Sequence, residues 1–270
     1  MMSPMFESLV VNSLTILADE PDDATAMVWN EAETQAELEG NEKAIYRLDL
    51  NDKEILLEDI EDLIAYSKIH KVKDFRLDKN EFFDEGVELL AEASALEKLL
   101  TLSLAYNKLS DKAVRSLAAS KFIVNLQKLF LQGNQISAEG VKFLVGSDSL
   151  ANLQLLYLNS NPIGPQGARA LGGPGKIMQL QELYFQNTGL GEKGLQALCE
   201  SENFKKLKLL SLSNNGLDDH AAELIYHSKA FPELETLDLY HNKISDQAID
   251  QLRSSPNFPK LKALQVDWRS

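Results

Sequence analysis

The chain has 270 residues and a formal net charge of −14 at pH 7, from 41 acidic and 27 basic side chains. Its basic residues do not gather into a stripe, which disfavours nucleic-acid binding, and no apolar stretch is long enough to span a membrane. The single cysteine, Cys199, excludes an intrachain disulfide and favours a reducing, cytoplasmic location.

The first 44 residues are strongly acidic. Residues 1–42 hold ten of the acidic side chains and no Lys or Arg. The common reason for such a head is a solvated cap, and the alternative is attraction of a basic partner. Apolar residues at helical spacing predict that residues 1–44 form a mostly helical N-terminal cap over the first repeat. The predicted contact residues are Phe6, Leu9, Val10, Leu14, Leu17 and Trp29.

From Ile45 to the last residue, one pattern returns every 27 residues without insertion or deletion. Each unit opens with L-x-x-L-x-L-x-x-N-x-L, as in Leu99–Leu109 and Leu234–Ile244. Self-similarity at a fixed period indicates a solenoid whose stacked units bury one another's apolar faces. Residues 45–270 are therefore predicted to form nine units, the last one truncated, that begin at Ile45, Val72, Leu99, Leu126, Leu153, Leu180, Leu207, Leu234 and Leu261.

Each unit reads as a short strand followed by a helix. Apolar positions alternate with variable ones in the first half, and N-cap residues, a small residue and Leu follow at helical spacing. An Asn follows the strand in most units, and a stacked column of amides can satisfy the turn backbone of neighbouring units. Thr188 replaces this Asn in one unit and can supply a hydroxyl, whereas Lys53 and Arg269 replace it in the end units.

These features resemble the ribonuclease-inhibitor-like subfamily of leucine-rich repeats over about five-sixths of the chain. The resemblance implies an α/β leucine-rich repeat solenoid, a curved horseshoe with a parallel sheet on the concave face and helices on the convex face. It is specific for the fold and weak for function. The family includes enzyme inhibitors, GTPase activators, ubiquitin-ligase adaptors and bacterial effectors.

The concave face contains the candidate binding residues. In a parallel sheet, equivalent positions of adjacent strands are about 5 Å apart, so columns can be predicted from the repeat. Aromatic residues at the centre of one column, flanked by amides, are typical of a binding hot spot, although the rings could instead support one another across strands. The predicted contact residues are Phe130, Tyr157, Tyr184, Gln132, Asn159, Gln186, Tyr240 and Leu155.

The sequence nominates no catalytic group, metal site or cofactor. His220, Glu223 and His227 share a predicted helix, but the two histidines are about 10 Å apart and need a further ligand. We therefore predict a non-catalytic protein–protein interaction module, monomeric apart from weak edge-to-edge association. The alternatives are a bacterial effector acting on a eukaryotic protein in the host cytosol, or a GTPase-activating protein of the same repeat family.

Overall fold

The computed structural model describes residues 2–17 and 45–267, so that Trp29 and Arg269 lie outside the described residues. The strands are β1 (Leu14–Leu17), β2 (Ile45–Asp49), β3 (Val72–Arg76), β4 (Thr101–Ser103), β5 (Lys128–Phe130), β6 (Leu155–Tyr157), β7 (Glu182–Tyr184), β8 (Leu209–Ser211), β9 (Thr236–Asp238) and β10 (Ala263–Gln265). The α-helices are α1 (Pro4–Asn12), α3 (Leu57–Ala65), α4 (Phe83–Glu92), α5 (Asp111–Ala119), α6 (Ala138–Gly146), α7 (Gly164–Gly172), α8 (Gly191–Cys199), α9 (Asp219–His227) and α10 (Asp246–Arg253). Two short 3-10 helices are η1 (Ile69–Lys71) and η2 (Ser94–Leu96).

The described strands form one open sheet in chain order from β1 to β10. From β2 onward neighbouring strands are parallel, and residues 27 apart in sequence pair, such as Ser103 with Phe130 and Phe130 with Tyr157. A register shift lies between Tyr46 and Arg47, where β2 meets β3. The period of the sequence therefore sets the strand register, and the predicted parallel sheet is confirmed.

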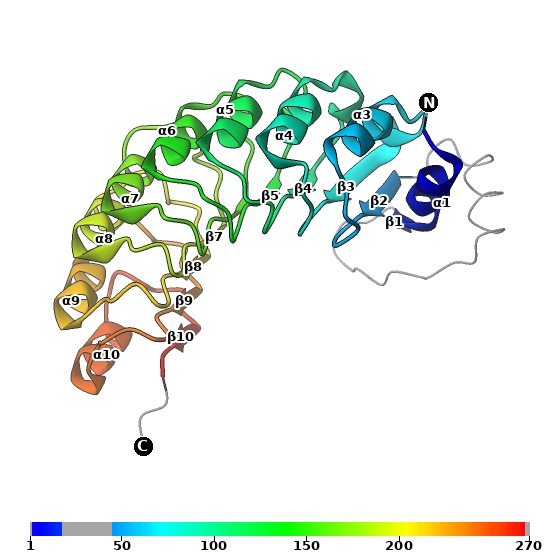
Figure 1. The fold of residues 1–270 in the computed structure, drawn as a ribbon. Coiled ribbons are helices and arrows are strands. Elements are labelled where there is room, and N and C mark those ends of the chain that lie inside the picture. Colours follow the sequence, from blue (N-terminus) through cyan, green and yellow to red (C-terminus); the bar gives the residue numbers. More distant parts are fainter. Residues whose placement is uncertain (1, 18–44, 268–270) are drawn as a thin grey trace.

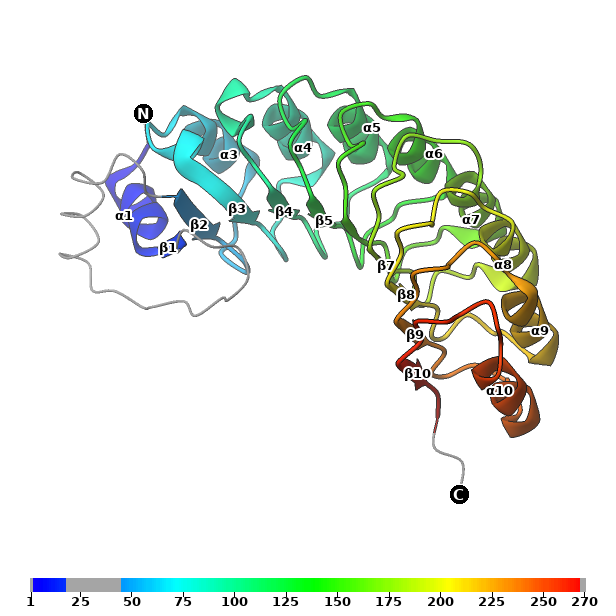
Figure 2. The same cartoon turned by 180° about the vertical axis from the view of Figure 1, so that it is seen from behind.

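The molecule is an arc with the strands on its inner side and helices α3 to α10 on its outer side (Figures 1 and 2). A helix is about 10 Å wide, whereas strands are spaced about 4.8 Å apart, so a stack of strand–helix units must curve. Small residues let the helices pack closely. A Cβ atom on Gly194 of α8 would lie 2.8 Å from the Ala168 Cβ atom of α7. The predicted solenoid, with a concave sheet and convex helices, is thus confirmed.

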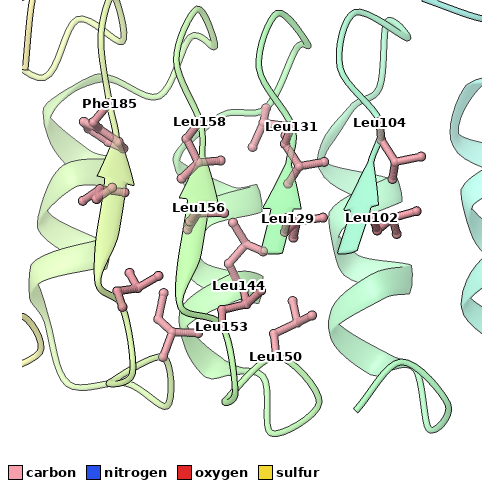
Figure 3. Packing of buried hydrophobic residues seen from close by; sticks show 14 of the residues in the cluster. Leu102, Leu104, Leu129, Leu131, Leu144, Leu150, Leu153, Leu156, Leu158 and Phe185 are labelled. Atoms are coloured by element: carbon pink, nitrogen blue, oxygen red, sulfur yellow. The ribbon is translucent and has the colours of Figure 1, made fainter. Parts of the chain in front are cut away.

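A single apolar core runs between the sheet and the helices (Figure 3). Strand residues such as Leu129 and Leu156 meet helix residues such as Leu144, and all three are fully buried. Phe185 takes a position that is Leu in most units and is also fully buried. Because each unit contacts only its neighbours, burial depends on stacking and no unit can form this core alone.

The predicted asparagine column is a hydrogen-bonded ladder that is interrupted at one position. In a representative unit, Asn134 Oδ1 accepts from the backbone N–H groups of Asn107 and Leu109, each at 3.0 Å. Its Nδ2 donates to the carbonyl oxygens of Leu104 at 3.0 Å and Leu131 at 2.9 Å. The side chain therefore joins two units through four backbone groups. Comparable bonds are made by Asn80, Asn107, Asn161, Asn215 and Asn242.

Thr188 interrupts this ladder. Its hydroxyl donates to the Phe185 carbonyl oxygen at 3.0 Å, inside its own turn. In the unit before it, backbone groups replace the bonds that an asparagine would make. The Ile163 N–H group donates to Asn161 O and the Gly164 N–H group donates to Thr188 O, both at 2.8 Å. Gly164 has φ +65°, a conformation that glycine adopts at little cost. The predicted hydroxyl is present and also lies 3.2 Å from Asn215 Oδ1 of the following unit, but it makes no bond to the preceding unit as the amide Nδ2 groups do.

The N-terminal segment differs from the predicted helical pattern. Helix α1 ends at Asn12, and Leu14–Leu17 forms strand β1, which pairs antiparallel with β2. The prediction that Leu17 lies on the same helix as Phe6 is therefore wrong. A strand is favoured here because β2 has an open edge whose backbone groups β1 satisfies. Phe6, Val10 and Leu14 are buried in the common core, as predicted for contact residues.

Candidate protein-binding face

The predicted contact residues lie on the concave side at the centre of the arc. Positions that alternate with the buried strand leucines point away from the core. The register places Phe130, Tyr157 and Tyr184 side by side on β5, β6 and β7. Leu155 begins β6, between Lys128 and Glu182 of the adjacent strands. This is the arrangement that the repeat predicts.

The three aromatic rings form a continuous stack. The ring centroids of Phe130 and Tyr157 are 4.9 Å apart with the planes inclined by 26°. Those of Tyr157 and Tyr184 are 3.8 Å apart with the planes inclined by only 11°. Each ring is half-buried, so the rings cover one another's faces and leave their edges toward solvent. The stack is rigid, which lowers the entropy lost when a partner covers it.

Both tyrosines of the stack remain neutral phenols at physiological pH. Burial raises the pKa of Tyr157, and burial followed by the hydrogen bond to Tyr157 raises the pKa of Tyr184. The Tyr184 hydroxyl also donates to Glu182 Oε2 at 3.2 Å. The centre of the face is therefore an uncharged aromatic surface, with Lys128 and Glu182 as the charged side chains on the same three strands.

A column of amides lies beside the rings, at Gln132, Asn159 and Gln186. The side-chain oxygen of each is shielded from solvent and accepts no hydrogen bond. A buried acceptor without a donor costs about 1–3 kcal/mol, and such groups are rare in folded proteins. The sequence predicted that amides would line this column, but it gave no sign that their oxygens would be buried and unsatisfied. The occurrence of this defect at three successive positions next to the rings marks the column as a candidate contact surface.

Charged residues at the N-terminal end of the concave face are paired with one another. Asp74 is buried and accepts from Arg47 Nε at 2.7 Å and Arg76 Nε at 3.1 Å. Burial raises the pKa of Asp78, although Ser103 Oγ donates to its carboxylate at 2.5 Å. These charged groups are therefore satisfied by one another within the chain.

Tyr240 does not join the aromatic stack. It lies on the turn after β9, and its backbone N–H group donates to Asp238 Oδ1 at 3.0 Å. Its ring centroid is 6.3 Å from that of His241. The structure therefore brings the other predicted contact residues together and leaves Tyr240 apart from them.

Two exposed aromatic residues were not identified from the sequence. Tyr106 lies in the turn after β4 and is 50% exposed, and Phe83 begins helix α4 and is 43% exposed. The Tyr106 ring lies against Gly133, where a Cβ atom would be 2.2 Å from the ring. The sequence does hold a signal for Tyr106, because the equivalent position of the next unit is Gly133, which leaves room for the ring.

The cysteine and histidine candidates considered from the sequence lie on helices α8 and α9. Burial raises the pKa of the Cys199 thiol to about 12, so it is a neutral group at physiological pH and a poor nucleophile. His220 lies 3.4 Å from Glu192 and 3.5 Å from Glu223. No group of three or more His, Cys, Asp or Glu in residues 2–17 and 45–267 is arranged to hold a metal ion. Within the same residues, no helix is long and apolar enough to cross a membrane.

Comparison with known families agrees with the geometry. The family model Leucine Rich repeat matches residues 95–118, 124–145 and 149–172, and a second model, Leucine Rich Repeat, matches residues 233–255. No curated protein matches the chain. Together with the solenoid, these matches show that the chain contains leucine-rich repeats and has the open α/β fold of a leucine-rich repeat solenoid. Such repeats are generally non-catalytic modules of protein–protein interaction.

Proposed function

We propose that this chain is a non-catalytic module that binds a protein partner on its concave sheet, at the aromatic–amide face formed by Phe130, Tyr157, Tyr184, Gln132, Asn159 and Gln186. One observation carries the proposal. Three neighbouring amide oxygens are buried without a donor, directly beside a rigid ring stack. Partner N–H groups that displace or turn these amides would recover the missing hydrogen bonds.

The composition of the face supports a protein as the ligand. Half-buried tyrosines and a phenylalanine provide apolar area with little conformational freedom to lose, and they are typical anchors of protein interfaces. Leu155 extends the apolar centre, while Lys128 and Glu182 provide opposite charges beside it. We further assign the repeats to the ribonuclease-inhibitor-like subtype, residues 1–44 to a cap and residues 45–270 to the array, on the basis of the repeat pattern.

The proposal is tested with a variant that removes the ring stack. Phe130→Ser/Tyr157→Ser/Tyr184→Ser is expected to weaken capture of the partner about 100-fold or more, because one anchor of this kind contributes about 2 kcal/mol or more and neighbouring anchors are not additive. The matched control is Phe143→Ser/Tyr226→Ser, two half-buried rings on the convex helices α6 and α9. Quantitative affinity capture with all three proteins, followed by titration of the purified partner, measures the difference.

A partner retained by the concave variant and lost by the convex control would place the site on the helices. Circular dichroism melts of the same proteins show whether the rings act through the fold. If the triple variant loses cooperative unfolding, the rings support the structure and the loss of binding says nothing about contact.

Removal of the unsatisfied amides is expected to separate binding from stability. In Gln132→Met/Asn159→Leu/Gln186→Met, buried acceptors are replaced by apolar groups of similar size, which is neutral or stabilising by about 1 kcal/mol per site. Partner binding should nevertheless fall about tenfold, because each interfacial hydrogen bond contributes about 0.5–1.5 kcal/mol. Gln166→Met on α7 is the control for loss of an exposed amide. A large loss of stability in urea titrations would show that the amides serve the fold instead.

A further inference from the structure

A second concave feature lies along the edge of the sheet where the parallel strands begin. A groove of about 510 Å³ follows this edge from β3 toward β7. Two lysines stand at one end, and no carboxylate lines it. The rest of its polar lining is made of amides, contributed by successive units. The groove residues used below are Lys73, Lys98, Asn125, Gln127, Asn152 and Gln154.

The two lysines of the groove have no ion-pair partner in the described part of the chain. Lysines at the same two repeat positions near the other end of the array are paired instead. Lys260 Nζ lies 2.5 Å from Glu233 and Lys262 Nζ lies 2.6 Å from Glu235. The positive charge at the groove is therefore open to a ligand, whereas the equivalent charge near β10 is neutralised within the chain.

The amides of the groove are held in a repeating orientation. Asn125 Nδ2 donates to the Glu97 carbonyl oxygen at 2.7 Å, and Asn152 Nδ2 donates to the Val124 carbonyl oxygen at 2.9 Å. Their side-chain oxygens remain as acceptors, and the side-chain amide of Gln127 has no hydrogen-bond partner among the described residues. Units repeat about 4.8 Å apart along the sheet, so these polar groups recur at regular intervals along the groove.

We propose that this groove binds an extended acidic segment of a protein, with carboxylates on Lys73 and Lys98 and peptide groups on the amides. The charge at one end and the neutral amides along the remainder fit a peptide better than a nucleic acid, which needs a basic track along its whole length. The net charge of −14 does not prevent this, because ions screen distant charges beyond about 8 Å at physiological salt. The groove shares no residue with the aromatic–amide face, so this proposal is independent of the proposed function.

The test uses a fluorescent peptide of alternating Glu and Ser, with fluorescence anisotropy as the readout. Lys73→Ala/Lys98→Ala is expected to bind it about tenfold more weakly than the unmodified chain, because two partly exposed ion pairs are lost. Lys260→Ala/Lys262→Ala removes the same net charge from the same repeat positions and should bind within about twofold of the unmodified chain. Binding should also weaken as salt is raised.

Four results would overturn the proposal. No binding by the unmodified chain at about 1 mM peptide would show that the groove has no useful affinity. Equal losses in the two lysine pairs would show that only the overall charge matters. Tighter binding of a single-stranded oligonucleotide would assign the groove to nucleic acid. If the peptide binds only after the acidic residues of 18–42 are neutralised, the ligand of the groove would be the acidic segment of this same chain.

The ring-stack variant separates this proposal from the function proposed for the concave centre. Phe130→Ser/Tyr157→Ser/Tyr184→Ser should bind the acidic peptide like the unmodified chain, whether or not it loses its protein partner. Equal loss of both would contradict the independence of the two surfaces.

Discussion

Replacement of Asn134 by alanine is expected to lower the free energy of unfolding by about 3–5 kcal/mol, because four backbone groups lose their partner at once. Two of them are N–H groups of the preceding unit, on Asn107 and Leu109. The other two are carbonyl oxygens that accept from Asn134 Nδ2. All four lie in a turn that water enters poorly, since Asn107 and Leu109 are fully buried. Urea denaturation measures the change.

Two control variants show whether the ladder is responsible. Asn125→Ala removes an exposed asparagine with one carbonyl contact and should cost less than about 1 kcal/mol. Asn134→Thr imitates the substitution that the chain itself carries at Thr188 and should recover only part of the loss. Full recovery is not expected, because the Thr188 site depends on Gly164 at positive φ, whereas Ser110 holds the equivalent place before Asn134. Equal effects of Asn134→Ala and Asn125→Ala would show that the ladder contributes nothing special.

The parts of this fold that depend on periodicity could be predicted from the sequence. Equivalent positions are always 27 residues apart, so the pairing of Phe130 with Tyr157 and of Tyr157 with Tyr184 follows from the repeat. The asparagine ladder follows as well, because an amide that recurs at the same position of successive units stacks on its copies. In a solenoid each unit contacts only its neighbours, so the position of a residue within its repeat already predicts which residues it contacts.

The parts that depend on side-chain detail or on contacts outside the repeat could not be predicted. Leu14–Leu17 fits a helix or a strand by its pattern, and only pairing with β2 decides between them. The detour around Thr188 depends on a backbone conformation that Gly164 permits. The burial of the Gln132 oxygen depends on how the amide rotates beside the rings, which no spacing rule describes.

Substitution of Val10 by aspartate is expected to destabilise the N-terminal end of the array by about 3–5 kcal/mol, because it places an unpaired charge in the core. Val10 is fully buried on α1, in the same apolar cluster as Tyr46 and Leu48 of β2. Strand β1, which follows α1, covers the edge of β2 (Figure 1). Met5→Asp on the same helix is the matched control, since Met5 is 86% exposed.

The position of the damage distinguishes a cap from an ordinary core residue. In a stack whose units contact only their neighbours, loss of one end opens the nearest units first. Hydrogen exchange in Val10→Asp should therefore become faster in β2 and β3, while β7 and β8 keep most of their protection. Met5→Asp should exchange like the unmodified chain throughout. Unchanged protection of β2 in Val10→Asp would show that α1 and β1 do not cap the array, and an even loss along all strands would show that the solenoid unfolds as one cooperative unit.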